Sequence, residues 1–263
     1  SAAFDTTQPV ANLEQVIEMV TAETIRSGRE VQVLLELKHA EHHALAGLDL
    51  AELLRDVLRR RQLSTPGSKV SVLSFEPRVL KQLAATTRLR LVQLLDADAM
   101  PGAVAANVVR AEQRRVGLDT VADYAQGVGL PWRLAVRESG DTTRLLHRLQ
   151  RRGLLTHIWT LRAENRFLPA PWRRQGPYGD LSVPVTALTQ AGVAGLITDH
   201  PDLVREVRYR NRDAADAGTD PQPRDGTHPV AADHRILGHQ FVEMAESEHQ
   251  LGGESGTEQA RHA

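Results

Sequence analysis

The feature that most constrains the fold is a regular alternation of short apolar segments with longer amphipathic segments. The short segments are rich in Val, Leu and Ile, and the longer ones repeat their apolar residues at helical spacing. We interpret the short segments as strands at residues 31–37, 70–75, 89–95, 127–130, 154–161 and 192–198. We interpret the longer ones as helices at residues 12–27, 49–62, 77–85, 118–125, 142–152 and 183–191. This order predicts parallel strands that are joined by crossover helices.

The number of strands and the glycine pattern narrow the α/β architecture further. About six strand–helix steps fit into residues 1–207, and no glycine-rich dinucleotide fingerprint follows any predicted strand. A (β/α)8 barrel is therefore the leading architecture, although a complete barrel has eight strands. The composition changes from residue 208, where Asp, Gly, Pro, Thr and His become frequent. We expect a barrel domain at 1–207 and a mostly disordered polar tail at 208–263, with a short amphipathic helix at 233–246.

Composition excludes several classes of function. The chain has 32 Lys and Arg residues against 33 Asp and Glu residues, and the formal net charge is −1. This balance gives no global electrostatic reason to expect binding to nucleic acid or to an anionic membrane. The chain has no Cys, which excludes disulfides, thiolate metal sites and a Cys nucleophile. No apolar run reaches the roughly 18 residues that span a bilayer, and no signal peptide is visible.

The first candidate functional groups follow the predicted strand at 31–37. Glu36 and Lys38 are two residues apart, so they share one face of that strand. In a barrel, functional groups lie at the carboxyl ends of the strands. A carboxylate there can bind a hard divalent cation, and an ammonium group can bind an anion. The alternative is a structural ion pair, and the nearby His39, His42 and His43 add further candidates in a solvated loop.

A second set of candidates follows the predicted strand at 154–161. His157 and Trp159 share a face of this strand, and Arg162 comes directly after it. Trp159 can line a pocket for an apolar or sugar-like group, although a core position is more common for Trp. Arg162 can hold a phosphate or carboxylate through two parallel hydrogen bonds. Asp199, at the end of the last predicted strand, is either an orienting residue or a helix cap.

Four segments together resemble the glycerophosphodiester phosphodiesterase family, especially its larger, often exported members. Residues 33–39 (VLLELKH) resemble the family's IELKH strand, and residues 72–77 (VLSFEP) resemble its SSFdP turn. Residues 157–169 (HIWTLRAENRFLP) resemble the vhpyTfRnEnyfLP segment. Residues 192–201 (GVAGLITDHP) resemble the closing GvDGiiTDyP segment. The segments occur in the family's order over roughly residues 8–206.

The resemblance implies a metal-dependent phosphodiesterase on a (β/α)8 barrel. Its reaction hydrolyses glycerophosphodiesters to glycerol 3-phosphate and an alcohol, with a divalent Ca or Mg ion at the phosphate and two His residues as acid and base. By position, Glu36 matches the metal-binding carboxylate and Lys38 the lysine that contacts the phosphate. Trp159 matches the aromatic position of the pocket, and Arg162 and Glu164 lie in the loop that follows. We therefore predict Glu36 as a metal ligand, and Lys38, Trp159 and Arg162 as substrate-binding residues.

The chain departs from the family in motifs that carry the chemistry. The family's His-Arg-Gly, Glu-x-Asp and His-Asp motifs do not occur in these 263 residues, so no catalytic residue is identified. By register the chain begins just before the family's third strand, which implies an N-terminally incomplete barrel that lacks about two strands. We expect this chain to be inactive or nearly so by itself. The alternative is a non-catalytic remnant or pseudoenzyme that binds a phosphate ligand or a partner chain.

Other interpretations and properties remain as expectations. Related barrel phospholipases that cleave choline- or inositol-bearing lipids are a third possibility, and an unrelated (β/α) barrel is a fourth. We expect a small-molecule glycerophosphodiester as partner, no nucleic acid and no transmembrane segment, and open strand edges would allow the chain to form an oligomer. The likeness to exported members favours a periplasmic or extracellular location.

Overall fold

The computed structural model describes residues 10–65, 67–95, 117–217 and 235–238. Its strands form one parallel sheet whose spatial order, β1 to β7, follows the order of the sequence. The strands are β1 (Val33–Glu36), β2 (Val70–Ser74), β3 (Arg90–Leu94), β4 (Gly127–Pro131), β5 (Leu155–Leu161), β6 (Gly195–Thr198) and β7 (Arg235–Gly238). Sequential parallel neighbours joined by helices are the arrangement of a (β/α) barrel. The predicted fold class, a partial barrel of this kind, is therefore confirmed.

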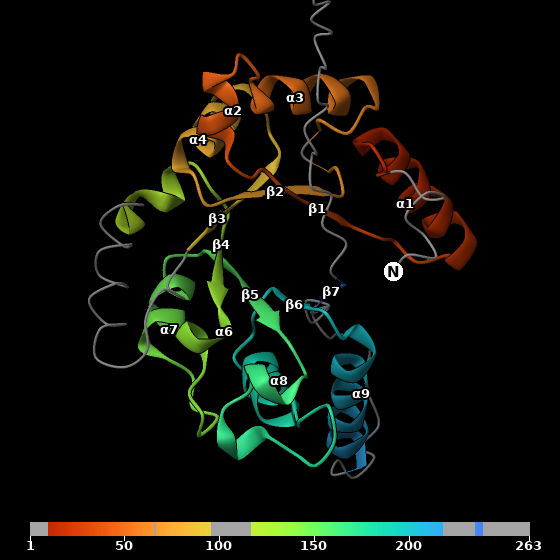
Figure 1. The fold of residues 1–263 in the computed structure, drawn as a ribbon, viewed down its shortest axis with the longest axis vertical. Coiled ribbons are helices and arrows are strands. Elements are labelled where there is room, and N and C mark those ends of the chain that lie inside the picture. The colour runs from red at the N-terminus through yellow and green to blue at the C-terminus, as the bar shows by residue number, and fades with distance from the viewer. Residues whose placement is uncertain (1–9, 66, 96–116, 218–234, 239–263) are drawn as a thin grey trace, which may run out of the picture.

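Helices follow the strands and lie outside the curled row that the strands make (Figure 1). The longer helices are α1 (Leu13–Ser27), α3 (Leu50–Arg60), α4 (Pro77–Thr86), α7 (Arg144–Gln150), α8 (Ser182–Gln190) and α9 (Pro201–Ala217). Shorter helical segments are α2 (Ala40–Leu45), η1 (Leu118–Asp123), α6 (Trp132–Ala135), η2 (Asn165–Phe167) and η3 (Ala170–Trp172). Among the described helices, none combines the length and the apolarity that crossing a bilayer requires.

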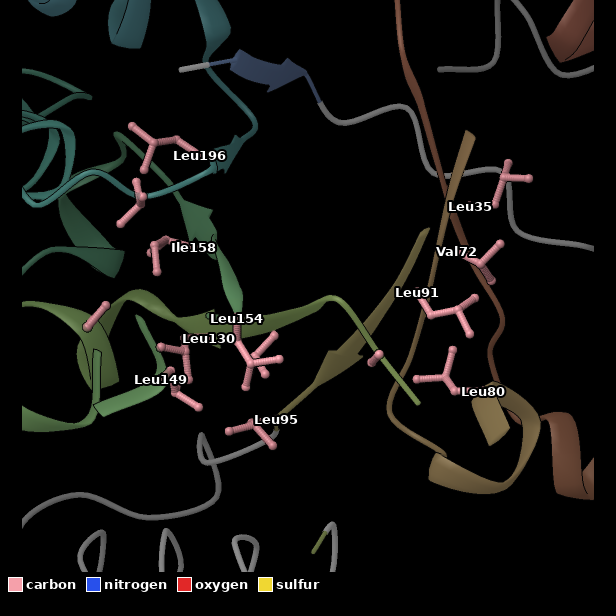
Figure 2. Close-up of a cluster of buried hydrophobic side chains, with 14 of the residues drawn as sticks. Leu35, Val72, Leu80, Leu91, Leu95, Leu130, Leu149, Leu154, Ile158 and Leu196 are labelled. Atoms are coloured by element: carbon pink, nitrogen blue, oxygen red, sulfur yellow. The ribbon is translucent and has the colours of Figure 1, made fainter. Parts of the chain in front are cut away.

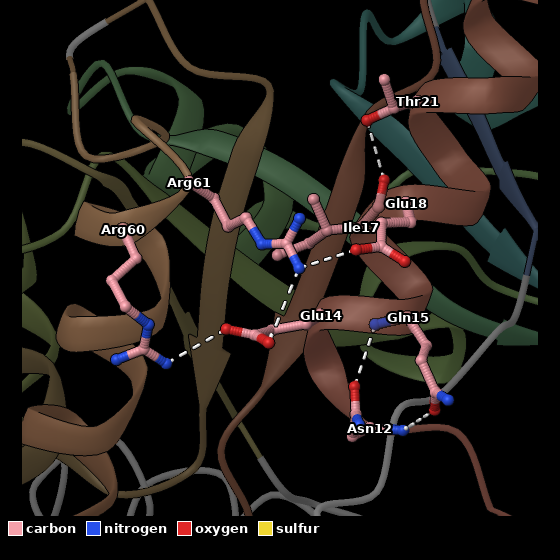
Figure 3. A network of polar contacts seen from close by, with 8 residues as sticks. All are labelled: Asn12, Glu14, Gln15, Ile17, Glu18, Thr21, Arg60 and Arg61. Atoms are coloured by element: carbon pink, nitrogen blue, oxygen red, sulfur yellow. Dashed lines mark hydrogen bonds and ion pairs between the residues drawn. The ribbon is translucent and has the colours of Figure 1, made fainter.

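The first helix is fixed by its cap and by ion pairs to α3 (Figure 3). The Asn12 side chain accepts a hydrogen bond from the Gln15 backbone, and the Gln15 side chain accepts one from the Asn12 backbone. This reciprocal arrangement is the capping box that the Asn12–Gln15 spacing predicts. Glu14 then pairs with Arg60 at 3.1 Å, and Glu18 pairs with Arg61 at 2.7 Å. Exposed ion pairs contribute little energy, so their role is to orient α1 against α3. The packing energy comes from the burial of Leu13, Val16 and Ile17.

The apolar side chains of the sheet form two groups, one on each face. The larger group fills the layer between strands and helices, and Figure 2 shows part of it, including Leu35, Val72, Leu91, Leu130 and Ile158. We call this side the outer face. The smaller group lies on the opposite side, which we call the inner face, and consists of Leu34, Leu73, Phe75, Val92, Leu94, Trp159 and Ile197. Adjacent residues such as Val72 and Leu73 take opposite faces because side chains alternate along a strand.

The inner face is strongly curved. The rings of Phe75 and Trp159 meet edge to face, with centroids 5.7 Å apart and an interplanar angle of 89°. Phe75 directly follows β2, Trp159 belongs to β5, and two strands lie between them in the sheet. Three strand spacings would place β2 and β5 about 14 Å apart in a flat sheet. The contact therefore requires the sheet to curl, with the inner face on its concave side.

The end of the chain differs from the prediction in two places. The expected boundary at residue 207 falls inside α9, which continues to Ala217 because it packs on α8, where Asn211 donates a hydrogen bond to Thr186 Oγ1. The expected helix at 233–246 is wrong over residues 235–238, which form β7 in parallel register with β6. Strand β6 offers backbone groups at its side, and pairing with them outweighs a local helical pattern. Residues 218–234 and 239–263 of the expected tail lie outside the described residues.

Other differences are local. The expected helix at 118–125 is a 3-10 segment, η1, and the connection between β5 and α8 contains the short 3-10 segments η2 and η3. The histidines at 42 and 43, expected in a loop, belong to the short helix α2. Their rings contact each other edge-on at 5.8 Å, and His39 precedes the helix as its N-cap residue.

Candidate functional site

Glu36 and Lys38 lie at the carboxyl edge of the sheet. Glu36 is the last residue of β1, and both side chains are half-buried. Leu37, between these two residues, and Leu35, just before Glu36, are buried. The alternation along the strand sends the leucines to the outer face and the Glu36 carboxylate to the concave side. Glu36 therefore belongs to the inner face, whereas Lys38 follows the end of β1 and its shared face with Glu36 stays a prediction.

The backbone after β1 is held by groups from β2. The buried Ser74 hydroxyl donates to the Leu37 carbonyl oxygen at 2.8 Å and accepts from the Glu76 N–H at 3.1 Å. The Glu76 carboxylate accepts from the Glu41 N–H at 2.7 Å, in the first turn of α2. His39, between these contacts, has a φ of 52°, in the left-handed region that a residue with a side chain seldom takes. These contacts hold the chain in that turn immediately beyond Lys38.

A buried amide joins the carboxyl ends of β2 and β3. The Gln93 side-chain N–H groups donate to the carbonyl oxygens of Ser74, Phe75 and Leu94 at 3.2, 3.1 and 3.0 Å. The Tyr124 hydroxyl donates to Gln93 Oε1 at 2.8 Å, which satisfies the remaining side of the amide. Because Phe75 is bound through its backbone, its ring is held against Trp159. Sequence reasoning missed Gln93, although a glutamine inside an apolar strand is a signal for such a role.

Trp159 and His157 are neighbours on the inner face of β5. Trp159 is half-buried, and its indole Nε1 has no acceptor among the described residues. His157 is 6% exposed, its Nδ1 also has no partner there, and burial lowers the pKa of His157 to about 4. Arg90 adds a smaller electrostatic effect in the same direction. His157 is therefore neutral at pH 7, and it acts as a buried polar ring in the core.

Glycine at position 129 makes room for a neighbouring side chain of the inner face. Gly129 of β4 and Gly195 of β6 stand in register with His157 on either side. A Cβ atom at Gly129 would overlap the side chain of Leu94, whereas its 3.4 Å distance to the indole of Trp159 is an ordinary contact. Leu94 therefore occupies the space that a larger residue at position 129 would fill.

The loops after β5 and β6 are joined by an ion pair and a histidine. Arg162 Nε lies 2.7 Å from Asp199 Oδ2, and the Arg162 guanidinium stacks on the ring of Phe167 at 4.7 Å. His200 Nδ1 accepts a hydrogen bond from the Ala163 N–H at 3.3 Å. His200 Nε2 lies 3.9 Å from a Glu164 oxygen that has no hydrogen-bond partner among the described residues. Arg162, predicted to bind substrate, is thus engaged by Asp199, and sequence reasoning missed His200.

The carboxylates of the site do not form a metal cage. Within the parts of the chain that the structure describes, no three His, Cys, Asp or Glu side chains gather closely enough to hold a metal ion. Ca²⁺ binds six to eight oxygen ligands, and Mg²⁺ favours an octahedron that often keeps several waters. Glu36 alone does not meet either requirement. The described residues therefore do not fit the divalent ion that the family resemblance implies, and we derive no chemical step through such an ion.

Comparison with known proteins relates the chain to one family by sequence and to several solved structures by fold. The model of the glycerophosphoryl diester phosphodiesterase family matches residues 2–203. A crystal structure from Silicibacter pomeroyi DSS-3, which carries the name of a glycerophosphoryl diester phosphodiesterase, superposes with a TM-score of 0.47 at 16% identity. The superposition covers 75% of this chain and 57% of that chain, so the present chain spans little more than half the length of its structural neighbour.

Proposed function

Because this chain belongs to the glycerophosphoryl diester phosphodiesterase family, we propose that its carboxyl edge binds the phosphodiester group of a glycerophosphodiester, the substrate that the family's reaction converts to glycerol 3-phosphate and an alcohol. The observation that supports this proposal is that Glu36 and Lys38, both half-buried, lie at the carboxyl end of β1. Active sites of barrel enzymes form at this edge.

Lys38 is the group that meets the phosphate. Its ammonium group carries a compact positive charge on a flexible stem, so it attracts a phosphodiester oxygen as a point charge. A half-buried position strengthens that attraction, because less water screens the charges than at an open surface. A phosphodiester held here carries one negative charge, and the charge on its oxygens increases when a nucleophile attacks phosphorus. Lys38 therefore stabilises both the bound substrate and the more highly charged transition state.

Glu36 and the aromatic pair determine how the rest of the substrate lies. The Glu36 carboxylate, two residues from Lys38, accepts hydrogen bonds from hydroxyl groups, which suits a glycerol moiety. Phe75 and Trp159 provide an apolar wall for the rest of the substrate. Arg162 is a weaker candidate for direct contact than its sequence position suggests, because Asp199 already engages it.

A second candidate function is phosphodiester binding without catalysis. The observation that favours it is that the described residues contain no acidic cluster for a metal ion. Both candidates use Lys38 in the same way, and they differ in turnover.

The test is the conversion of glycerophosphocholine by the purified 263-residue chain, followed by ³¹P NMR with either Ca²⁺ or Mg²⁺ present. We expect the chain to broaden the ³¹P line of glycerophosphocholine by binding it, and an unbroadened line would contradict the proposed binding. We expect no glycerol 3-phosphate above a protein-free control, because the family's His-Arg-Gly, Glu-x-Asp and His-Asp motifs do not occur in these 263 residues. Turnover that requires the metal ion and disappears in Glu36→Gln would instead show that this chain is a complete enzyme with Glu36 in its machinery. Glu52→Gln, an exposed carboxylate on α3, serves as the matched control.

A further inference from the structure

A group of arginines surrounds Phe167 and Leu168, in the loop after β5. Arg162 and Arg166 both stack on the Phe167 ring, with their guanidinium carbons 4.7 and 4.6 Å from its centroid. Arg133, from α6 after β4, donates to the Phe167 carbonyl oxygen at 3.2 Å. Arg173 donates to the Leu168 carbonyl oxygen at 2.9 Å. We call Arg133, Arg162, Arg166 and Arg173 the arginine cluster.

The arginine cluster carries more positive charge than its neighbours neutralise. Asp199 pairs closely with Arg162 at 2.7 Å, whereas the nearest approach between Arg166 and Glu164 is 3.7 Å. Arg133 and Arg173 have no carboxylate within 4.0 Å among the residues that the structure describes. Like charges within one loop repel one another, and a bound anion would relieve that repulsion. The whole chain has a net charge of −1, which makes the excess local to this loop.

Aromatic stacking prepares the guanidinium groups for an anion. The Arg133 guanidinium lies 4.6 Å from the centre of the Trp132 ring, and Arg162 and Arg166 lie on Phe167. Stacking covers the flat face of a guanidinium and leaves its N–H edge available for hydrogen bonds to oxygen. The Arg166 side chain is 74% exposed, so a dissolved ligand reaches it directly.

We propose that the arginine cluster binds a small dianion of the phosphate monoester class, at a site separate from Lys38. The two negative charges of a phosphate monoester match the positive charges of Arg133 and Arg173, which no close carboxylate neutralises. A phosphodiester carries only one negative charge. The cluster suits a dissolved ligand better than a lipid surface, because Leu168 is buried and Phe167 lies between guanidinium groups, so neither side chain is available to insert into a bilayer. Glycerol 3-phosphate belongs to this ligand class, but the inference does not rest on the proposed hydrolysis.

The test is isothermal titration with glycerol 2-phosphate as the dianion and dimethyl phosphate as the monoanion, at pH 8 and low salt. We expect saturable binding of glycerol 2-phosphate that weakens at least tenfold in Arg133→Gln/Arg166→Gln and at least threefold in Arg166→Gln alone. The matched control, Arg26→Gln/Arg59→Gln, removes the same charge from α1 and α3, where both arginines are exposed. That control should change the affinity less than twofold.

Several results would overturn the inference. One is equal weakening in the cluster and control double variants, which would mean that only net charge matters. Another is loss of glycerol 2-phosphate binding in Lys38→Gln but not in the cluster variants, which would place the anion at the phosphodiester site. A third is an absence of saturable binding by the unmodified chain. Sedimentation with phosphatidylcholine vesicles that contain phosphatidic acid tests the lipid-borne source, and binding there that exceeds binding of the dissolved dianion would also contradict the proposal.

Discussion

Acid should destabilise this protein through His157 in particular. The side chain is 6% exposed, lies between Gly129 and Gly195 on the neighbouring strands, and has an Nδ1 atom without a described partner. Burial lowers its pKa from 6.5 to about 4. Protonation in the folded state would place a charge in this environment without a counterion. The unfolded chain accepts the proton at an ordinary pKa instead.

The direction and the size of the effect follow from the two pKa values. Above pH 6.5 the ring is neutral in both states, so His157 then imposes no penalty. Between pH 6.5 and pH 4 the unfolded state binds a proton that the folded state does not, and stability falls as the pH falls. The loss approaches about 1.4 kcal/mol for each pH unit and reaches about 2 kcal/mol at pH 5. The full contribution, near pH 4, is about 3 kcal/mol.

Urea denaturation at several pH values measures this loss. We expect the free energy of unfolding of the unmodified chain to decline between pH 7 and pH 5 by about 2 kcal/mol more than that of His157→Leu, which cannot be protonated. His42→Leu removes an exposed histidine from α2 and should leave the decline unchanged. A curve for His157→Leu that runs parallel to that of the unmodified chain would refute the reasoning. So would an NMR titration in which the His157 ring protonates with an ordinary pKa.

Two further predictions concern the packing that positions the site. Gln93→Leu should lower the free energy of unfolding by about 3 kcal/mol, because the Phe75 carbonyl and the Tyr124 hydroxyl lose their buried partner; a loss below about 1 kcal/mol in chemical denaturation would mean that water replaces the amide. Gly179→Ala should cost about 2 kcal/mol, because its Cβ would lie 2.5 Å from the Trp172 carbonyl oxygen. Gly153→Ala is the control for Gly179→Ala. A Cβ at Gly153 would meet nothing within 4 Å, so only the positive φ of Gly153 opposes the substitution. Equal changes of melting temperature in the two variants would contradict the packing argument.

The strands and most helices could be predicted because their signals are local. The apolar run at Val70–Ser74 is buried throughout, which matches the continuous apolar pattern of a parallel strand covered on both faces. The capping box at Asn12 and Gln15 is likewise a short-range signal. In contrast, β7 depends on pairing with β6, about forty residues earlier in the chain. Local periodicity contains no information on that pairing.

The candidate site likewise has features that a local sequence pattern predicts and features that depend on tertiary structure. The position of Glu36 at the carboxyl end of β1 follows from a local apolar pattern, so the sequence was sufficient to predict it. The pairing of Arg162 with Asp199 depends on the distance between the ends of β5 and β6, which no sequence pattern reports. The arginine cluster joins Arg133, which follows β4, to residues 162–173, which follow β5. That contact also depends on how the two strand ends lie in space, and no local sequence pattern predicts it. The functional roles of Glu36, Lys38, Trp159 and Arg162 stay predictions.

The most direct test of the central claim is the affinity of glycerophosphocholine for the purified chain and its lysine variants, measured by ³¹P line broadening. Lys38 and Lys69 are matched, because Lys69 lies at the opposite end of the sheet, just before β2, where it pairs with Glu30 at 2.7 Å. We predict that Lys38→Gln weakens binding at least tenfold and that Lys69→Gln leaves it within twofold. Equal affinities in the unmodified chain and in Lys38→Gln would contradict the assignment of the phosphodiester site to the inner face at the end of β1.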